Sequence, residues 1–360
     1  MTILSYILIS LSSIVIAFIN LSPQFGSNPN KEQKKYYSTF SNYKNNEFNN
    51  QENTLMVTAD MPMSIFFKRD SNRIPIENIV SKNINMEEFK NNNIINFSWL
   101  GHSAFLFNIN GKLLMLDPML SQHASPIPIP TLKRYSDIAL SFEDIDTIDA
   151  VIFSHDHYDH LDYSTIKKLR EKVVNYFVPL GIGNHLINWG IDPKYITELN
   201  WNQSIQFDEI KLICLPSRHF SGRGPFNRNS TLWASWALIS KYGKIYFSGD
   251  SGYGKHFKKI GDQYGPFDLV LIDSGQYNKA WKHSHMFPEE AIIAAKDLVA
   301  KYFMPIHWGT FTLSTHSWNE PIYESIFYAK KHNQQIIAPE IGEVVFLNNI
   351  NNQIYNWWSE

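Results

Sequence analysis

The stretch from Val151 to Asp162, VIFSHDHYDHLD, constrains the fold and chemistry of this chain more than any other. An apolar run ends there in three histidines and three aspartates. Imidazole nitrogens and carboxylate oxygens are common ligands of Zn²⁺, Mn²⁺ and Fe, and the spacing H-x-H-x-D-H supplies four of them within six residues. His155 and His157 can point to one side of an extended segment, whereas Asp159 and His160 follow a turn and can address a second ion. A solvated polar loop is the alternative, but this density of histidines beside an apolar strand favours a metal site.

Four later segments repeat the pattern of an apolar, strand-like run that ends in a potential ligand. They are Lys211–His219, Lys244–Asp250, Asp268–Asp273 and Tyr302–Gly309. In open α/β sheets, ligands bind beyond the carboxyl ends of the strands, so we expect these run ends to meet at one site. They add His219, Asp250 and His307 to the candidate metal ligands, and Asp273 to the candidate site residues.

Short motifs spread over residues 90–347 extend this pattern. In chain order they are Trp99–Ser103, Leu116–Pro118, His123–Pro126, Ser154–Asp162, Pro216–His219, Gly249–Tyr253, Gly265–Leu269, His285 followed by Pro288–Ala291, and Ile306–Phe311. In these motifs the chain resembles the metallo-β-lactamase superfamily, and within it the branch of N-acyl-phosphatidylethanolamine-hydrolysing phospholipase D and related bacterial lactonase-like hydrolases. One block departs from the lipase, because the polar stretch Ile272–Asn278 stands where the lipase has an apolar, proline-containing run.

The resemblance implies an α/β protein of the metallo-β-lactamase fold, a four-layer αβ/βα sandwich with the metals at the seam between two β-rich halves. It implies two zinc ions, with manganese or iron as alternatives. The resemblance assigns three ligands to one ion, three to the other and one bridging ligand: His155, His157 and His219; Asp159, His160 and His307; and Asp250. It also makes Asp250 catalytic, and makes His285 a partner of a substrate phosphate or oxyanion; a helix-capping surface histidine is the alternative for His285.

Three further polar residues each allow two interpretations. Asp162 follows the cluster and can accept a proton from a metal-bound imidazole, or it can complement the dipole of the helix that begins there. Asp273 can orient a metal ligand or a substrate hydroxyl, or it can be a buried acid paired with a backbone donor. His102 is placed near the site by the resemblance, and a structural role is expected for it.

The expected function is that of a hydrolase in which two ions share a water, lower its pKa and hold the resulting metal-bound hydroxide for attack on a phosphorus or carbonyl centre. The resemblance favours a phosphodiesterase of phospholipase D type acting on N-acyl-phosphatidylethanolamine-like lipids. A lactonase or other carboxylic-ester hydrolase is one alternative, because Asp273 and Ser274 suggest a more polar pocket. A membrane-tethered, non-catalytic binding protein is another, and the complete ligand set argues against it.

Residues 3–21 form an almost uninterrupted apolar stretch without a charged side chain, close to the length that crosses a bilayer. We therefore predict a membrane anchor at 1–21, with the catalytic domain on the cytoplasmic side because Lys31, Lys34 and Lys35 follow it. A signal peptide, with a secreted or envelope location, is the alternative. Residues 22–53 are polar and poor in aliphatic side chains, which predicts a linker, and the hydrolase domain is expected at 54–360.

Composition excludes other classes of function. The formal net charge of −2 gives no broad basic field, so nucleic acid is not expected as a partner and a small molecule or a lipid is. Cys214 is the only cysteine, so neither an intramolecular disulfide nor a cysteine-based zinc site can form. The oligomeric state is left open.

Local patterns predict part of the secondary structure. Asn110 and Gly111 between two apolar runs predict a hairpin of residues 104–109 and 112–116. Apolar spacing predicts helices over Leu161–Lys172 and Pro288–Ala300. Strands near 204–207, 210–215, 232–240 and 244–248 are expected to form the second β-rich half.

Overall fold

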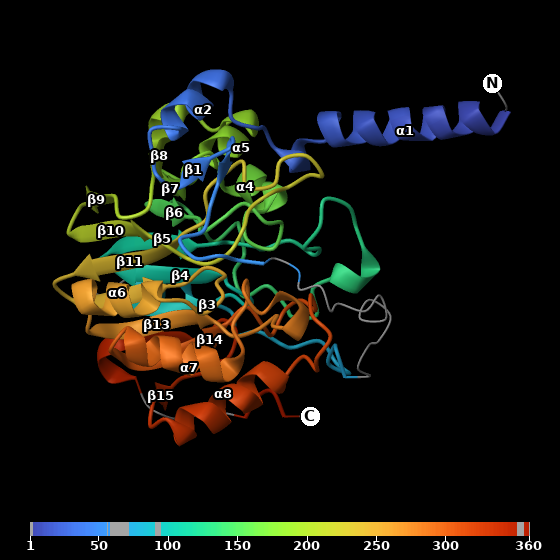
Figure 1. The fold of residues 1–360 in the computed structure, drawn as a ribbon. Coiled ribbons are helices and arrows are strands. Elements are labelled where there is room, and N and C mark those ends of the chain that lie inside the picture. The colour runs from blue at the N-terminus through green and yellow to red at the C-terminus, as the bar shows by residue number, and fades with distance from the viewer. Residues whose placement is uncertain (1–2, 56, 58–71, 91–94, 351–355, 360) are drawn as a thin grey trace.

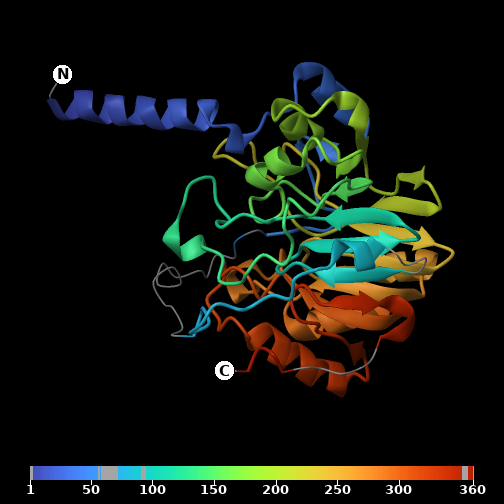
Figure 2. The same ribbon diagram turned by 180° about the vertical axis from the view of Figure 1, so that it is seen from behind.

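The computed structural model describes residues 3–55, 57, 72–90, 95–350 and 356–359. Within these residues, the strands form two seven-stranded mixed sheets and a separate two-stranded hairpin. The two sheets face each other, and helices lie on the outside (Figures 1 and 2). This mixed α/β arrangement is the metallo-β-lactamase fold expected from the sequence.

The first sheet begins with antiparallel strands and continues with parallel ones. Its order is β16 (Val344–Phe346), β3 (Asn96–Trp99), β4 (Phe105–Ile109), β5 (Lys112–Leu116), β6 (Ala150–Ile152), β7 (Tyr176–Pro179) and β8 (Ile196–Leu199). The change to parallel pairing occurs between β5 and β6. The helices associated with this half are α3 (Met86–Lys90), α4 (Tyr163–Leu169) and α5 (Gly183–Asn188).

The second sheet has the same antiparallel-then-parallel pattern. Its order is β9 (Ser204–Phe207), β10 (Ile210–Leu215), β11 (Ser235–Ser240), β12 (Gly243–Phe247), β13 (Phe267–Asp273), β14 (Ala300–Ile306) and β15 (Gln335–Ile336). Its outer face is covered by α6 (His256–Tyr264), α7 (Pro288–Asp297) and α8 (Glu320–Lys331), as Figure 1 shows. Short 3₁₀ helices occur at Pro23–Phe25, Pro130–Leu132, Pro193–Tyr195, Lys279–Trp281 and Leu347–Asn349.

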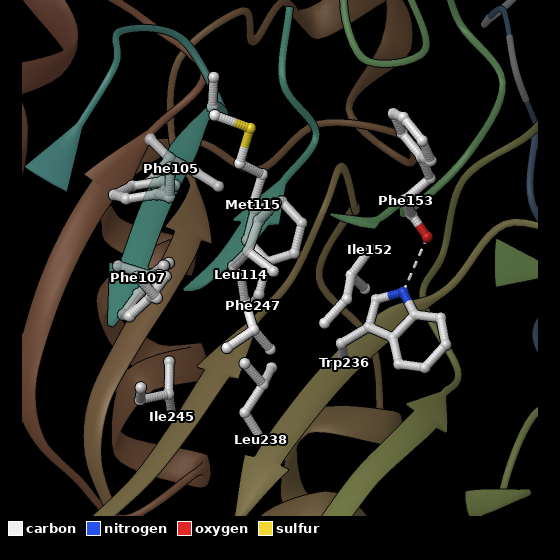
Figure 3. Packing of buried hydrophobic residues seen from close by; sticks show 14 of the residues in the cluster. Phe105, Phe107, Leu114, Met115, Ile152, Phe153, Trp236, Leu238, Ile245 and Phe247 are labelled. Carbon is white, nitrogen blue, oxygen red and sulfur yellow. Dashed lines mark hydrogen bonds between the residues drawn. The ribbon is translucent and has the colours of Figure 1, made fainter. Parts of the chain in front are cut away.

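The core lies between the two sheets (Figure 3). Phe105 of β4 and Phe247 of β12 meet across the layers with their ring centroids 6.5 Å apart. The indole of Trp236 on β11 donates a hydrogen bond to the Phe153 carbonyl at 2.9 Å, just after β6, so a polar group also joins the layers. All four side chains are fully buried, and each contributes roughly 1.5–3 kcal/mol to stability by its burial.

The sequence predicted these elements well, except that two helices are shorter than expected. The hairpin of β4 and β5 is confirmed, with Asn110 at φ 53° and Gly111 at φ 81° in its turn. The helix expected over Leu161–Lys172 is shorter, because Asp162 caps its start and Arg170 its end. The helix expected over Pro288–Ala300 ends at Asp297, because the chain turns at Val299 (φ 55°) and enters β14.

The N-terminal apolar stretch forms α1 (Ile3–Leu21), which projects away from the rest of the molecule (Figures 1 and 2). Across the residues that the structure describes, we find no helix with the length and apolar character needed to cross a membrane. The predicted anchor is therefore not supported, and the cytoplasmic placement of the domain stays a prediction.

Residues 22–53 do not behave as the unpacked linker that their composition predicted. They form α2 (Lys31–Tyr37) and a hairpin of β1 (Tyr43–Lys44) and β2 (Glu47–Phe48). The side chains of Tyr37, Tyr43 and Phe48 are buried in the main hydrophobic core and contact one another. The prediction was wrong because the mean composition hides three aromatic side chains at positions that reach the domain. The boundaries proposed at residues 21 and 53 stay predictions.

Candidate metal centre

The predicted ligands lie together on loops at the carboxyl ends of strands. The cluster His155–His160 follows β6, His219 follows β10, Asp250 follows β12 and His307 follows β14. The chain turns sharply into Asp250 at Gly249, whose φ of 56° favours glycine. A larger residue would also clash there, because its Cβ would lie 2.4 Å from Ser154 Cβ. The seven side chains therefore converge as the run-end pattern predicted, although their role as ligands stays a prediction.

Asp250 stands at the centre of the group. Its Oδ2 atom lies near the Nε2 atoms of four histidines, two from each predicted set: His160 at 3.1 Å, His307 at 3.4 Å, His155 at 3.7 Å and His219 at 3.8 Å. Its Oδ1 atom is buried and has no hydrogen-bond partner within the part of the chain that the structure describes. One carboxylate shared by two groups of imidazoles is the arrangement that a bridging ligand requires.

The first set consists of His155, His157 and His219. His219 Nδ1 lies 3.0 Å from the carbonyl of Ser284, which can only accept, so the ring proton sits on Nδ1 and Nε2 carries a lone pair. His157 Nδ1 lies 3.2 Å from His219 Nε2 and 2.9 Å from His155 Nε2. The three ring nitrogens thus converge on one point, as the ligands of one cation do.

The second set consists of Asp159, His160 and His307. Asp159 Oδ2 lies 3.5 Å from His160 Nε2 and 3.9 Å from His307 Nε2. His160 donates its Nδ1 proton to Asp117 Oδ2 at 2.7 Å, because a carboxylate accepts only. Its buried Nε2 has no hydrogen-bond partner among the described residues. The second set therefore also brings two imidazole nitrogens and a carboxylate oxygen close to one another.

These donors fit divalent metal ions. Burial lowers the pKa of His157 to about 4 and holds the pKa values of His155, His219 and His307 well below the usual value, so these four rings are neutral, as ligands must be. Burial also acts to lower the pKa of His160, but the neighbouring carboxylates raise it well above the usual value, so an ion bound there would displace a proton from this ring. Burial also raises the pKa of Asp250 to about 7, against the opposing influence of His160. Two buried atoms without partners, His160 Nε2 and Asp250 Oδ1, are what an ion would satisfy. Nitrogen and oxygen donors of this kind suit zinc, manganese or iron.

Asp117 has a supporting part in the site that its sequence pattern did not reveal. Asp162 was a candidate acceptor for a ligand imidazole, but its carboxylate caps α4 through Ser164 N and Thr165 N and also bonds Ser121. Asp117 takes that part instead, directly for His160 and, through the hydroxyl of Ser154, for His155. The signal was present, because Asp117 directly follows β5 in the run-end pattern.

His102 also contributes more than the structural role expected for it. Its Nε2 donates to Asp159 Oδ2 at 2.9 Å, because that carboxylate oxygen can only accept. Its backbone accepts from His307 N at 3.0 Å and donates to Trp308 O at 3.1 Å. His102 (φ 53°) and His307 (φ 70°) both occupy the left-handed region, which costs about 1–3 kcal/mol for such residues and is tolerated where the surroundings fix them.

His285 and Asp273 form a pair at the edge of this group. His285 Nδ1 lies 2.9 Å from Asp273 Oδ2, and Asp273 is completely buried. Asp273 also accepts from the backbone N–H groups of Ser251 and Gly275, as the interpretation of a buried acid paired with backbone donors expects. An orienting role toward a metal ligand or a substrate hydroxyl stays a prediction. Burial works against a charged ring, but Asp273 beside it raises the pKa of His285 above the usual value.

A cavity of about 410 Å³ opens onto the centre. Side chains of both predicted sets and His285 line its base. Apolar side chains form much of the remaining lining: Val57, Phe220, Trp281 and Leu313. The site therefore joins a polar, histidine-rich base to an apolar wall.

Comparisons with known proteins agree with this description. A model of the beta-lactamase superfamily domain matches residues 114–308. An uncharacterized protein of Mycobacterium tuberculosis is 43% identical over 252 residues, which cover 69% of this chain and 68% of that protein. N-acyl-phosphatidylethanolamine-hydrolyzing phospholipase D 1 of Caenorhabditis elegans is 36% identical over 245 residues, or 65% of this chain and 69% of that protein. The isothiocyanate hydrolase from Delia radicum gut bacteria shares the fold, with a TM-score of 0.56 at 18% identity over 69% of this chain and 98% of that one.

The fold, the converging ligands and these matches define a class of protein. The chain belongs to the metallo-β-lactamase superfamily and is a metal-dependent hydrolase. Among its candidate metal-binding groups are His155, His157 and His219 with Asp250, and Asp159, His160 and His307 with His102.

Proposed function

We propose that the chain is a binuclear, zinc-dependent phosphodiesterase of phospholipase D type that acts on N-acyl-phosphatidylethanolamine-like lipids. The observation that carries the binuclear part is the position of Asp250 Oδ2 within 3.8 Å of four imidazole nitrogens from two ligand sets. A single ion takes only about four protein ligands, so seven converging donors support two ions. Manganese and iron are the alternatives to zinc.

Ions held by these residues supply a water of lowered pKa and a positive charge beside a substrate oxygen. His285 is the residue that we propose transfers the proton required by the reaction. Its Nδ1 proton is committed to Asp273, which leaves Nε2 of a ring that lines the cavity for the substrate. Because Asp273 raises the pKa of His285, the ring can hold a second proton, stabilise negative charge on phosphate oxygens and protonate the departing alkoxide.

The apolar wall of the cavity supports a lipid substrate. Phe220 and Trp281 stand beside the histidine-rich base, where a hydrocarbon chain next to a phosphodiester would lie. The similarity to a phospholipase D at 36% identity supports the same class of substrate. Binding to a membrane surface is part of this proposal and is tested with the same substrate in vesicles.

A lactonase or carboxylic-ester hydrolase is the second candidate. The reason given for it was a polar pocket around Asp273, yet Asp273 is buried beneath His285 and does not itself line the cavity. Gln276 does line the cavity, and its presence keeps an ester or lactone as the alternative substrate. A binding protein without catalysis is disfavoured because all seven candidate ligands are present and converge.

The test compares substrates on the zinc-loaded full chain. N-acyl-phosphatidylethanolamine, in micelles and in vesicles, is offered in ¹⁸O-labelled water beside a long-chain lactone. We expect the label in the phosphate of the phosphatidic acid product, because phospholipase D chemistry breaks the phosphorus–oxygen bond to the leaving ethanolamide. Faster turnover of the lactone with no labelled phosphatidic acid would favour the second candidate, and no hydrolysis of either by fully metallated protein would favour the binding protein.

A further inference from the structure

The segment formed by Phe48–Leu55, with Val57 beyond it, lies close to the metal centre. At its start, Phe48 is fully buried and its N–H donates to the carbonyl of Asn229 at 2.9 Å. Near its end, Leu55 N donates to His283 Nδ1 at 3.2 Å, and Val57 lines the cavity. The segment is thus attached at both ends, beside the loop that carries His219.

Asn50 makes the closest connection between this segment and a predicted ligand. Its Nδ2 donates to the carbonyl of His219 at 2.8 Å, and its Oδ1 accepts from the N–H of His219 at 3.2 Å. Oδ1 also accepts from the indole of Trp233, a residue only 1% exposed, at 3.2 Å. One amide side chain therefore satisfies both backbone groups of His219, as a neighbouring strand would, and is itself fixed by a core tryptophan.

The residue before His219 is attached to the same segment. Arg218 donates from Nε to Thr54 Oγ1 at 3.0 Å and from Nη2 to the Asn53 carbonyl at 2.8 Å. Its Nη1 donates to the carbonyl of Tyr253 at 2.9 Å, in the loop that follows Asp250. The loop is therefore bonded to this segment at two consecutive residues. Arg218 bonds to Asn53 and Thr54, and His219 bonds to Asn50.

This attachment determines where the His219 ring can lie. The ring is fixed at Nδ1 by the Ser284 carbonyl, and its backbone is fixed at both polar groups by Asn50. A zinc–nitrogen bond is about 2.0–2.1 Å long, so displacements of well under 1 Å matter to a ligand. Loss of the Asn50 bonds would free the backbone and leave the ring with one fixed point.

We propose that Asn50 is a positioning residue that holds His219 in place for metal binding. It acts through the His219 backbone and touches neither substrate nor reacting atoms. The proposal rests on the metal function proposed above. It makes residues 22–53, expected from composition to be a linker, a part of the metal centre.

The experiment compares Asn50→Ala with Asn49→Ala in the full chain. Asn49 is the matched control, because among the described residues its side chain bonds only to the carbonyls of Lys44 and Glu47, just before the segment. Asn50→Asp is the partial rescue, since it keeps two acceptor bonds and loses the donor. Metal affinity is measured by chelator competition, and Co²⁺ absorption reports the coordination of each ion.

We expect Asn50→Ala to lower the affinity for one of the two ions by about 10–100-fold, the usual effect of removing a group that orients a ligand. The affinity for the other ion should be unchanged. Asn50→Asp should fall between Asn50→Ala and wild type, and Asn49→Ala should match wild type. Thermal melting of the metal-free proteins separates ligand positioning from a general loss of stability.

Equal affinities for both ions in Asn50→Ala and wild type would overturn the positioning role while leaving the binuclear proposal intact. An equal loss of affinity for both ions, together with a lower melting temperature, would also overturn it, because the effect would then be a general loss of stability. A wild type that binds one ion contradicts the binuclear function, yet selective loss of that ion in Asn50→Ala would still support the positioning role.

Discussion

The two ligand sets of the metal centre are held in place differently. His219 of the first set depends on the neutral amide of Asn50, which is 169 positions away in the sequence. Asp159 and His160 of the second set bond to His102 and Asp117, which are 57 and 43 positions away. Asp117 serves both sets, because it also bonds Ser154 beside His155.

The charge of the two sets differs as well. The first set offers three neutral imidazoles, whereas the second has a carboxylate of its own, Asp159. Burial opposes the ionisation of Asp159, but His160 and the hydrogen bond from His102 hold its pKa well below the usual value. Because opposite charges attract more strongly in a buried site, we expect the second set to bind its ion more tightly and a chelator to empty the first set first.

The largest expected effect removes the group that the two sets share. Asp250→Ala takes away the carboxylate oxygen nearest to four imidazoles, so both ions should be lost or greatly weakened. Metal ions contribute several kcal/mol to such reactions, so hydrolysis should fall by at least about 10³-fold. Elemental analysis and turnover are measured beside Asp262→Ala, an exposed acid on α6. Retention of two ions by Asp250→Ala would show that the two sets do not share this ligand.

A smaller effect is expected from a residue that belongs to neither set. His285→Ala should leave the metal content near normal and slow turnover by about 10²-fold, the lower range for loss of a positioned acid or base. His283→Ala is the control, because His283 lies two positions away and bonds to Leu55 N. If His285→Ala lost metal as completely as Asp250→Ala, His285 would have to be counted among the ligands.

The third effect is confined to the second set. His102→Asn removes the donor to Asp159, and asparagine tolerates the left-handed backbone at this position (φ 53°). We expect the affinity of the more tightly bound ion to fall by about 10–100-fold, which brings the two ions closer together in a chelator titration. His332→Asn, which removes a surface histidine beside Glu289, is the control. A selective loss of the weaker ion would reverse the assignment of the two sets.

The sequence predicted the convergence of the candidate ligands far better than the residues that support them. His155, His157, Asp159 and His160 are close in sequence, and each later ligand follows an apolar run, so local pattern was enough. Support depends on distant contacts. The residues around Asn50 do not indicate that its amide bonds to His219. The two residues are 169 positions apart, and only the fold brings them together.

The same limit explains the wrong linker prediction at the start of the chain and the two interpretations left open at Asp162. Tyr37 and Phe48 are buried by residues far along the chain, and mean composition carries no information about such partners. Asp162 and Asp117 were both acids next to predicted elements, and only the fold shows which of them faces His160. Sequence pattern predicts what is local, and tertiary contacts decide between equivalent local candidates.

The smallest expected effect is on stability. It tests whether the region around residues 23–55 can become more stable while the metal affinity of the first ligand set stays the same. Glu198 on β8 accepts from Gly181 N at 2.9 Å and Gly183 N at 2.8 Å, and it lies near Tyr37. Burial raises its pKa to about 7, against the opposing influence of these two bonds. A raised carboxyl pKa means that the folded state binds the proton more tightly than the unfolded state, so wild type loses stability as the pH rises toward 7.

Glu198→Gln keeps an oxygen for both backbone donors and never acquires the charge. Its stability should match that of wild type near pH 4.5 and exceed it by roughly 1 kcal/mol above pH 7, a figure kept small because solvent reaches part of the side chain. Urea unfolding at both pH values measures this difference, and Glu171→Gln, an exposed acid, should show none. The affinities of both ions should stay unchanged, because Glu198 contacts no predicted ligand among the hydrogen bonds that the described residues make. A pH-dependent gain in the affinity of the first set alone would show that His219 responds to the stability of this whole side of the molecule, and not only to Asn50.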